Sequence, residues 1–254
     1  MIRAIPNIFT LLNLVCGCIA IVLILQPEES VAYLKEGVLF LRLPEKMVYA
    51  SLFLFAAAII DFLDGFLARL LRATSDMGKQ LDSLSDVVSF GVAPSLILYQ
   101  LLRMSFMQQS NGLDTPGWYF VPAVLFACAG AWRLARFNID QRQSRSFRGV
   151  PIPISGLVVA SLPLMLWFSH NDIAAMILQP WVLYIIIFIL SGFMVSSVPI
   201  MSLKLAGLGV KQNRPQYLLL ALSLLLIVIF QWQSVILIYL TYVVLSLLLR
   251  NKIS

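Results

Sequence analysis

Four aspartates stand close together in a stretch of chain that is otherwise apolar enough to lie in a membrane. Asp61 and Asp64 form one pair, and Asp82 and Asp86 form a second. Residues three or four apart share one face of a helix, so each pair presents two carboxylates on one side. Because like charges repel and hard carboxylate oxygens suit Mg²⁺ or Mn²⁺, the spacing predicts a divalent metal site between two helices.

The alternative for these aspartates is solvation at the membrane surface. A single aspartate near a helix end is explained well by that interpretation. A carboxylate at bilayer depth costs about 2.5–3.5 kcal/mol on insertion scales, however, so several together need a compensating partner. Four at this spacing favour the metal site.

Small residues and one arginine accompany the carboxylates. Gly65 and Ala68 follow Asp64, and Gly78 precedes Asp82 by one helical turn, so the backbone is left open to a bulky ligand there. Arg69 adds a cation whose planar fork of donors suits a phosphate or pyrophosphate. Carboxylates, metal and arginine together predict phosphoryl-type transfer.

The composition indicates that the elements carrying these residues lie in lipid. Of the 254 residues, 60% are hydrophobic and 12% are charged. A bilayer core needs roughly 20 apolar residues per helix, and spanning backbone must satisfy its own hydrogen bonds. We expect an all-α, polytopic membrane helical bundle of about eight transmembrane helices. The expected spans are 8–25, 47–63, 87–104, 119–135, 152–168, 181–195, 217–230 and 235–249.

The basic residues predict the orientation, because cytoplasmic loops collect Lys and Arg. With the N-terminus inside, only four of the 18 basic residues fall on the outer side: Lys35, Arg42, Lys46 and Arg103. Both termini and the carboxylate site are therefore expected on the cytoplasmic side of the inner (cytoplasmic) membrane. The net charge of +6 is explained by this topology and by anionic lipid headgroups, so we expect no nucleic-acid partner.

No internal repeat or low-complexity tract interrupts the spans. We therefore expect one integral membrane domain over residues 1–254, with a core at about 1–200 and an additional helix pair at about 215–250. The longest outer loop, 26–46, is expected to carry a short surface helix or a hairpin.

The motif resembles the signature of the CDP-alcohol phosphotransferase family. The matching run is Asp61-x-x-Asp64-Gly65-x-x-Ala68-Arg69, eight residues, then Gly78-x-x-x-Asp82-x-x-x-Asp86. It covers 26 residues at fixed spacing, and the surrounding spans fit that family's six-helix catalytic core.

The resemblance implies a role for each position of the motif. Asp61, Asp64 and Asp82 would hold the metal, and Asp86 would complete the site and act as general base. The pocket for the CDP-linked lipid would be lined by Gly65, Ala68, Arg69 and Gly78. The base would take the proton of an acceptor hydroxyl, whose oxygen attacks the phosphorus that bears the lipid as CMP leaves.

Further segments resemble the phosphatidylserine synthase branch of that family, namely 5–13, 85–94, 132–138, 149–153 and 198–204. This resemblance implies transfer of the phosphatidyl group from CDP-diacylglycerol to the hydroxyl of L-serine. Arg133 and Arg136, assisted by Asn138, are candidates to bind the serine carboxylate, although ordinary positive-inside charge explains both arginines equally well. Asn7 and Thr10 are candidates to contact the cytidine nucleotide, with helix capping as the alternative for Asn7.

Two other functions stay open. A sibling enzyme would use glycerol-3-phosphate or inositol-phosphate as acceptor, which needs more converging basic residues, and Arg142, Arg145 and Arg148 are available. A membrane transporter would also bury carboxylates between helices, but no inverted repeat or broken-helix pair supports one. We further expect a homodimer.

Overall fold

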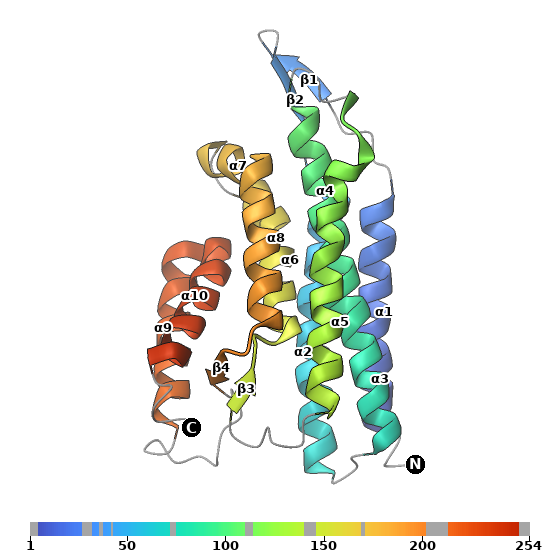
Figure 1. Ribbon diagram of the computed structural model, residues 1–254, viewed down its shortest axis with the longest axis vertical. Coiled ribbons are helices and arrows are strands. Elements are labelled where there is room, and N and C mark those ends of the chain that lie inside the picture. Colours follow the sequence, from blue (N-terminus) through green and yellow to red (C-terminus); the bar gives the residue numbers. More distant parts are fainter. Residues whose placement is uncertain are drawn as a thin grey trace.

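The computed structural model describes residues 5–26, 32–35, 38–41, 43–71, 75–109, 114–139, 146–168, 171–201 and 213–248, and these form a helical bundle (Figure 1). The helices are α1 Ile5–Leu25, α2 Glu45–Leu70, α3 Asp76–Asp86, α4 Ala93–Met107, α5 Val124–Ile139, α6 Ile152–Phe168, α7 Asn171–Ile177, α8 Pro180–Val195, α9 Arg214–Phe230 and α10 Ser234–Leu248. Short strands pair antiparallel, β1 Ala32–Lys35 with β2 Val38–Leu41 and β3 Ser146–Arg148 with β4 Pro199–Met201.

The prediction of an all-α polytopic membrane protein is confirmed. Within the described ranges, five helical stretches are long and apolar enough to cross a bilayer: Pro6–Leu25, Glu45–Leu70, Asp76–Met107, Gly117–Ile139 and Arg214–Leu248. The last stretch folds back on itself as the α9–α10 hairpin, and α6 and α8 are shorter apolar helices. Each of the eight expected spans therefore overlaps a helical segment, although only the five stretches named above are long enough to cross a bilayer.

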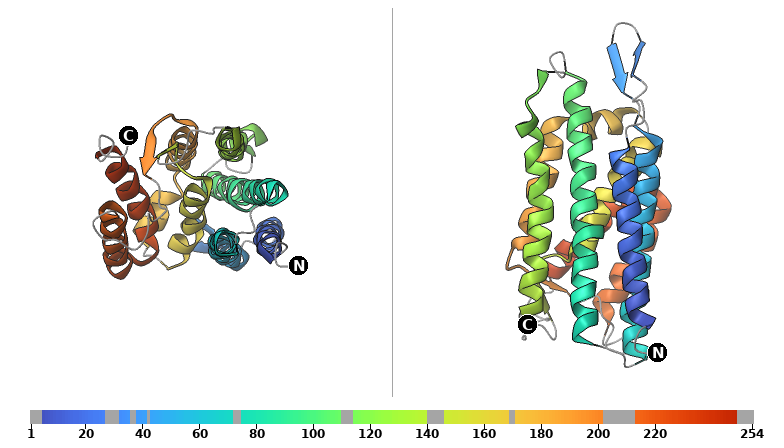
Figure 2. Two further views of the ribbon diagram at one scale, coloured as in Figure 1. Left: turned by 90° about the horizontal axis from the view of Figure 1, so that it is seen from below. Right: turned by 90° about the vertical axis from the view of Figure 1, so that its right-hand side faces the viewer.

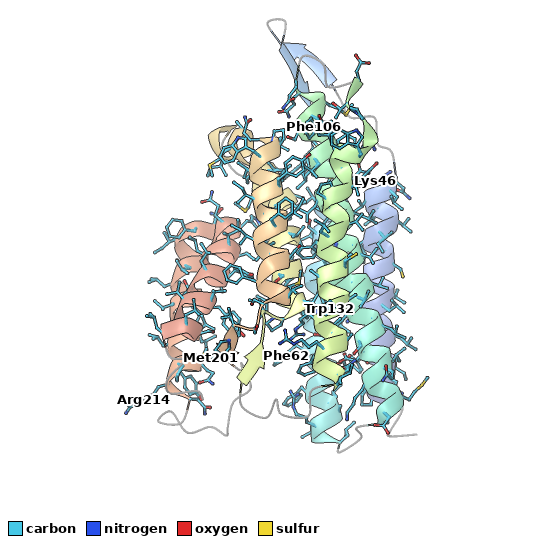
Figure 3. All side chains as sticks on the ribbon, viewed as in Figure 1. Lys46, Phe62, Phe106, Trp132, Met201 and Arg214 are labelled. Atoms are coloured by element: carbon cyan, nitrogen blue, oxygen red, sulfur yellow. The ribbon has the colours of Figure 1, made fainter. Side chains whose placement is uncertain are left out.

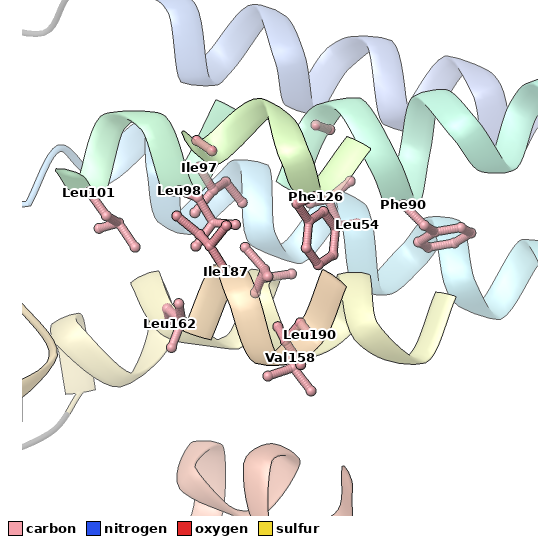
Figure 4. Packing of buried hydrophobic residues seen from close by; sticks show 14 of the residues in the cluster. Leu54, Phe90, Ile97, Leu98, Leu101, Phe126, Val158, Leu162, Ile187 and Leu190 are labelled. Atoms are coloured by element: carbon pink, nitrogen blue, oxygen red, sulfur yellow. The ribbon is translucent and has the colours of Figure 1, made fainter. Parts of the chain in front are cut away.

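Large apolar side chains cover the outside of the bundle as well as its centre. On α1, Ile8, Val15 and Val22 are about half exposed. Monomeric soluble proteins rarely expose contiguous apolar surface of this kind, whereas a lipid-facing helix requires it. The interior is filled by side chains from α2, α4, α5, α6 and α8, and Figure 4 shows them interlocking, among them Leu54, Leu98, Phe126, Leu162 and Ile187.

The helix that carries Asp82 and Asp86 continues without a break from Asp76 to Met107. Directly after Asp86 it widens into a π-helical segment, Val87–Val92, before α4 begins. Seen from the side in Figure 2, α1, this long helix and α5 run along one another. A π segment inserts an extra residue in a turn and is frequent at functional sites, and here it directly follows the second carboxylate pair.

Glycines allow the closest contacts around the π segment. A Cβ built on Gly17 of α1 would lie 2.9 Å from Ser89 Cα, and one on Gly156 of α6 would lie 2.9 Å from the Phe90 carbonyl oxygen. The backbones therefore approach too closely for any side chain. This packing fixes α1 and α6 against the helix that bears two of the four aspartates.

The start of α1 and the end of α10 lie toward the same end of the bundle, and the β1–β2 hairpin lies at the opposite end (Figure 1). The hairpin is one of the two structures expected for the 26–46 loop. Figure 3 labels Lys46, one of the basic residues expected on the outer side, near the end that carries the hairpin, and Arg214, expected on the inner side, near the opposite end. Arg42, also expected on the outer side, lies outside the described residues. Which end faces the cytoplasm stays a prediction.

Replacing Gly17 by Ala should lower the stability of the protein, because the new methyl group has no room beside Ser89. Overpacking of this kind typically costs about 1–3 kcal/mol. The midpoint of thermal unfolding in detergent should fall by several degrees. Gly192→Ala on α8 is the matched control, since a Cβ there meets nothing within 4 Å. Equal midpoints for the two variants would contradict the close contact of α1 with the π segment.

Candidate active site

The two aspartate pairs meet where α2 and α3 lie against α1. Asp61 and Asp64 project from α2, and oxygens of Asp61, Asp64 and Asp82 all lie within 4.8 Å of one another. Asp86, one helical turn after Asp82, interacts electrostatically with Asp61, Asp82 and Asp64. The structure thus brings all four aspartates of the motif into one cluster.

Helix α1 holds the cluster in place through two hydroxyl groups. The Thr10 hydroxyl donates to Asp64 Oδ2 at 2.8 Å, and Asp64 is almost completely buried. The Ser85 hydroxyl of α3 donates to the Thr10 carbonyl at 3.1 Å, and that of Ser89 donates to the Asn13 carbonyl at 3.1 Å. Thr10, expected to contact nucleotide, therefore also orients one of the carboxylates.

An open pocket lies beside the cluster, with about 450 Å³ of empty space that includes the solvent at its mouth. It is lined by Pro6, Asn7, Thr10, Asp64, Gly65, Ala68, Ser75, Gly78, Lys79 and Asp82. Five of the six residues expected to bind the CDP-linked lipid are in this lining. The sixth, Arg69, is exposed, and its guanidinium nitrogen lies 3.6 Å from the position of a Cβ built on Gly65.

The two glycines keep opposite walls of the pocket open. A Cβ on Gly65 would meet only the Arg69 side chain, so the space beside its backbone is free. A Cβ on Gly78 would lie 3.0 Å from Asn7 Oδ1 and 3.1 Å from Ser75 Oγ, which would crowd the start of α3. Side chains at either position would reduce the room for a ligand.

Three lining residues, Pro6, Ser75 and Lys79, were not among the site residues predicted from the sequence, and two of these carry polar side chains. Ser75 caps α3, since its hydroxyl accepts a hydrogen bond from the Gly78 amide at 3.0 Å, and Lys79 adds an exposed ammonium group at the pocket. Positions 75, 78, 79 and 82 recur at helical spacing and therefore lie on one helix face. Following this spacing back from Asp82 would have identified Ser75 and Lys79 as neighbours of the site.

The three residues expected to bind serine differ in their surroundings. Arg133 on α5 is buried and interacts electrostatically with Asp86, and its Nε–H has no hydrogen-bond partner among the described residues. Arg136 instead donates to the Val195 carbonyl at 3.3 Å, and Asn138 donates to the Ser83 hydroxyl at 2.8 Å. Of the three, Arg133 is the one that faces the carboxylate cluster with a free donor.

The donor set of the cluster fits a hard divalent cation. All candidate ligand atoms are carboxylate oxygens, which Mg²⁺ and Mn²⁺ prefer. Within the described ranges, the buried Asp86 Oδ1 has no hydrogen-bond partner, and an unpaired buried polar atom calls for a partner such as a bound ion. Asp61, Asp64, Asp82 and Asp86 are the residues that would hold the ion.

Comparison with known proteins gives a consistent result. The family model of the CDP-alcohol phosphatidyltransferases matches residues 3–190 of the chain. The chain is 34% identical over 169 residues to the CDP-diacylglycerol–serine O-phosphatidyltransferase of Bacillus subtilis (strain 168), which covers 66% of this chain and 78% of that enzyme. It is 36% identical over 156 residues to the protein of the same name from Helicobacter pylori (strain J99 / ATCC 700824), covering 61% and 54%.

A third relative has a different name. The archaetidylserine synthase of Methanothermobacter thermautotrophicus (strain ATCC 29096 / DSM 1053 / JCM 10044 / NBRC 100330 / Delta H) is 28% identical over 184 residues, covering 72% of this chain and 67% of that enzyme. The chain spans little more than half the length of the Helicobacter relative, and α9 and α10 lie beyond the residues matched by the family model.

Replacing Thr10 by Val should weaken divalent-metal binding without changing the shape of α1. The valine cannot donate to Asp64, and loss of a residue that orients a metal ligand typically costs about 10- to 100-fold in metal affinity. The measurement is the concentration of Mg²⁺ that gives half of the maximal thermal stabilisation of the purified protein. Thr10→Ser, which keeps the hydroxyl, should respond like the wild type. A Val variant stabilised at wild-type concentrations would remove Thr10 from this role.

Proposed function

The chain belongs to the CDP-alcohol phosphatidyltransferase family, and on that premise we propose that it is a phosphatidylserine synthase. It transfers the phosphatidyl group of CDP-diacylglycerol to the hydroxyl of L-serine and releases CMP. The observation that carries this proposal is the aspartate cluster beside an open pocket, with Arg133 facing Asp86. Two of the relatives described above are named for the same reaction, and the third for a serine transfer in archaea.

The nucleotide end of the lipid substrate occupies the pocket between α1, α2 and α3. Gly65, Ala68 and Gly78 leave its walls free of side chains, and Asn7 offers an amide to the cytidine. Arg69 and Lys79 bring positive charge to the mouth, where they attract the pyrophosphate. The family is divalent-metal dependent in general, and a bound Mg²⁺ or Mn²⁺ would neutralise charge on the pyrophosphate oxygens.

The serine end of the reaction lies toward α5. The Arg133 guanidinium binds the serine carboxylate, because its Nε–H is buried and finds no acceptor in the part of the chain that the structure describes. This binding directs the serine hydroxyl toward Asp86. Asp86 takes the hydroxyl proton while the serine oxygen attacks the phosphorus that bears the lipid, and the bond from that phosphorus to the CMP oxygen breaks. Holding both substrates in one cleft removes much of the entropic barrier.

The sibling acceptors differ from serine by carrying a phosphate. Arg142 and Arg145, which would be needed to bind it, lie outside the described residues, and Arg148 lies in β3, where its side chain is not described. A single buried arginine beside the base matches one carboxylate better than a doubly charged phosphate. Serine is therefore the acceptor that we propose. Because the chain belongs to a family of phosphatidyltransferases, we prefer an enzyme to the transporter alternative.

The protein is a multi-pass membrane protein. We place it in the inner (cytoplasmic) membrane with both termini and the active site on the cytoplasmic side, because the basic residues concentrate at that end of the predicted topology. We treat residues 1–254 as one domain in which α9 and α10 extend the core. A homodimer stays a prediction, since lipid would cover the exposed apolar faces of α1 and α9 as well as a second subunit would.

The acceptor is identified by product analysis. Purified protein is given CDP-diacylglycerol together with labelled serine, glycerol-3-phosphate or inositol-phosphate in parallel reactions. We expect label from serine in a phospholipid, with one CMP released per molecule formed. Labelled lipid from one of the phosphorylated acceptors but none from serine would contradict the proposal and would identify a sibling activity.

Replacing Asp86 by Asn should separate binding from chemistry. Loss of a general base typically reduces the rate by about 10²- to 10⁴-fold, whereas affinity for the CDP-lipid rests on the pocket walls and their basic residues. The measurements are CDP-lipid affinity and single-turnover transfer to serine. Asp76→Asn, an exposed residue at the start of the same helix, is the control and should transfer at the wild-type rate.

Two outcomes would remove Asp86 from the role of base. Transfer by Asp86→Asn at nearly the wild-type rate would show that another group takes the proton. A loss of CDP-lipid affinity in step with the loss of rate would make Asp86 chiefly a metal ligand.

A further inference from the structure

Another pocket lies at the end of the bundle opposite the aspartate cluster. It has about 680 Å³ of empty space, which includes the solvent at its mouth, and it is lined by the last turn of α1, the start of α2 and the end of α4. The candidate active site is lined instead by the first turns of α1. Helix α1 has 21 residues and therefore spans about 30 Å, the thickness of a bilayer core. The two pockets thus lie toward opposite membrane surfaces.

The wall of this pocket is mostly apolar. Ile24 of α1, Met47 of α2 and Met104 of α4 are buried, with at most 6% of each side chain exposed. Leu23 and Met107 are half-buried and complete the apolar lining. Unbranched methionine side chains adapt to ligands of irregular shape. The pocket is therefore suited to a flexible hydrocarbon chain.

Arg103 brings a positive charge to the pocket. The side chain of Gln100 donates to the Ile24 carbonyl at 3.2 Å, and its amide oxygen accepts from Arg103 Nη1 at 3.3 Å. No carboxylate among the described residues pairs with Arg103. Glu45, in the first turn of α2, is exposed and accepts from the Tyr49 hydroxyl at 2.7 Å. The other donors of the guanidinium are thus open to an anion.

Aromatic side chains place Arg103 at the level of the lipid headgroups. Its Cζ lies 5.9 Å from the centre of the Tyr99 ring, and Phe106, one turn further along α4, lies 5.3 Å from Tyr119 between ring centres. Trp118 stacks on Tyr119 and is 65% exposed. Figure 3 labels Phe106 near this end of the bundle. Because Trp and Tyr gather at the membrane–water interface, the guanidinium lies where phosphate groups of lipids are found.

We propose that this pocket binds an anionic phospholipid of the leaflet opposite the active site. The phosphate pairs with Arg103, and one acyl chain lies along Ile24, Met47 and Met104. A free phosphate would leave the apolar wall uncovered, whereas a phospholipid joins an anionic group to a hydrocarbon chain. The lipid connects α1, α2 and the long α3–α4 helix, which hold the aspartate cluster at their other ends. It is not a substrate of the proposed reaction.

The test follows the thermal midpoint of purified protein in a neutral detergent as phosphatidylglycerol or phosphatidylcholine is added. A ligand that binds only the folded state raises the midpoint as its concentration increases. We expect phosphatidylglycerol to raise it further than phosphatidylcholine. Arg103→Gln should need about five- to tenfold more phosphatidylglycerol for half of the full rise, because the contact between charges is lost. Arg103→Lys, which keeps the charge, should stay closer to the wild type.

Arg214→Gln is the matched control, because it removes an exposed arginine near the opposite end of the bundle. Its response to phosphatidylglycerol should equal that of the wild type.

The place of binding is found with phosphatidylglycerol that carries a photoreactive diazirine in its acyl chain. The label should concentrate on the peptide that contains Met104 and Met107, and the phosphatidylcholine analogue should label this peptide less. Met107→Trp fills the pocket but keeps Arg103, so it should reduce the labelling. Excess glycerol phosphate should not displace the label, because it lacks an acyl chain.

Four results would overturn the inference. The first two are equal responses of the wild type and Arg103→Gln, and equal losses for Arg103→Gln and Arg214→Gln, which would indicate attraction by overall charge. The others are a label that avoids the peptide with Met104 and Met107, and a label displaced by glycerol phosphate, which would indicate a phosphate site. None of these measurements follows transfer to serine, so a different acceptor would contradict the proposed function alone.

Discussion

Four carboxylates lie together at the end of a membrane bundle, where lipid cannot solvate them. The polar side chains around this cluster hold it in place and compensate its charge. Left alone, such charges repel one another and would push α2 and α3 apart. Instead the Thr10 hydroxyl binds Asp64, hydroxyls of Ser85 and Ser89 bind the backbone of α1, and Arg133 faces Asp86. We propose that a divalent cation supplies the rest of the positive charge that the four carboxylates need.

Tight helix contacts give the cluster a rigid support. Gly17 and Gly156 let α1 and α6 touch the backbone of the π segment that follows Asp86, so the long α3–α4 helix is held on two sides. Catalytic groups on helices are placed more reproducibly than groups on loops. The same arrangement leaves the pocket open on the side of Gly65 and Gly78.

The sequence was most informative where chemistry and periodicity coincide. The motif from Asp61 to Asp86 predicted a shared cleft because its spacing places each pair on one helix face, and eight apolar runs predicted eight helices. The sequence was less informative about the residues expected to bind the acceptor serine. Arg136 and Asn138 were grouped with Arg133 by charge and proximity, yet the structure pairs them with Val195 and Ser83, and their role toward serine stays a prediction. The Tyr242 hydroxyl donates to the carbonyl of Met201, a partner 41 residues away in the chain, and no local pattern reveals such a contact.

Binding of a divalent cation by the aspartate cluster can be measured by titrating purified protein with Mn²⁺ and following the free ion by electron paramagnetic resonance. The wild type and the Asp76→Asn control should bind Mn²⁺ with the same affinity, and Mg²⁺ should compete. Asp61→Asn, Asp64→Asn and Asp82→Asn should each bind it much more weakly, because each removes a carboxylate from the cluster. Equal Mn²⁺ binding by all five proteins, or none by the wild type, would contradict the account.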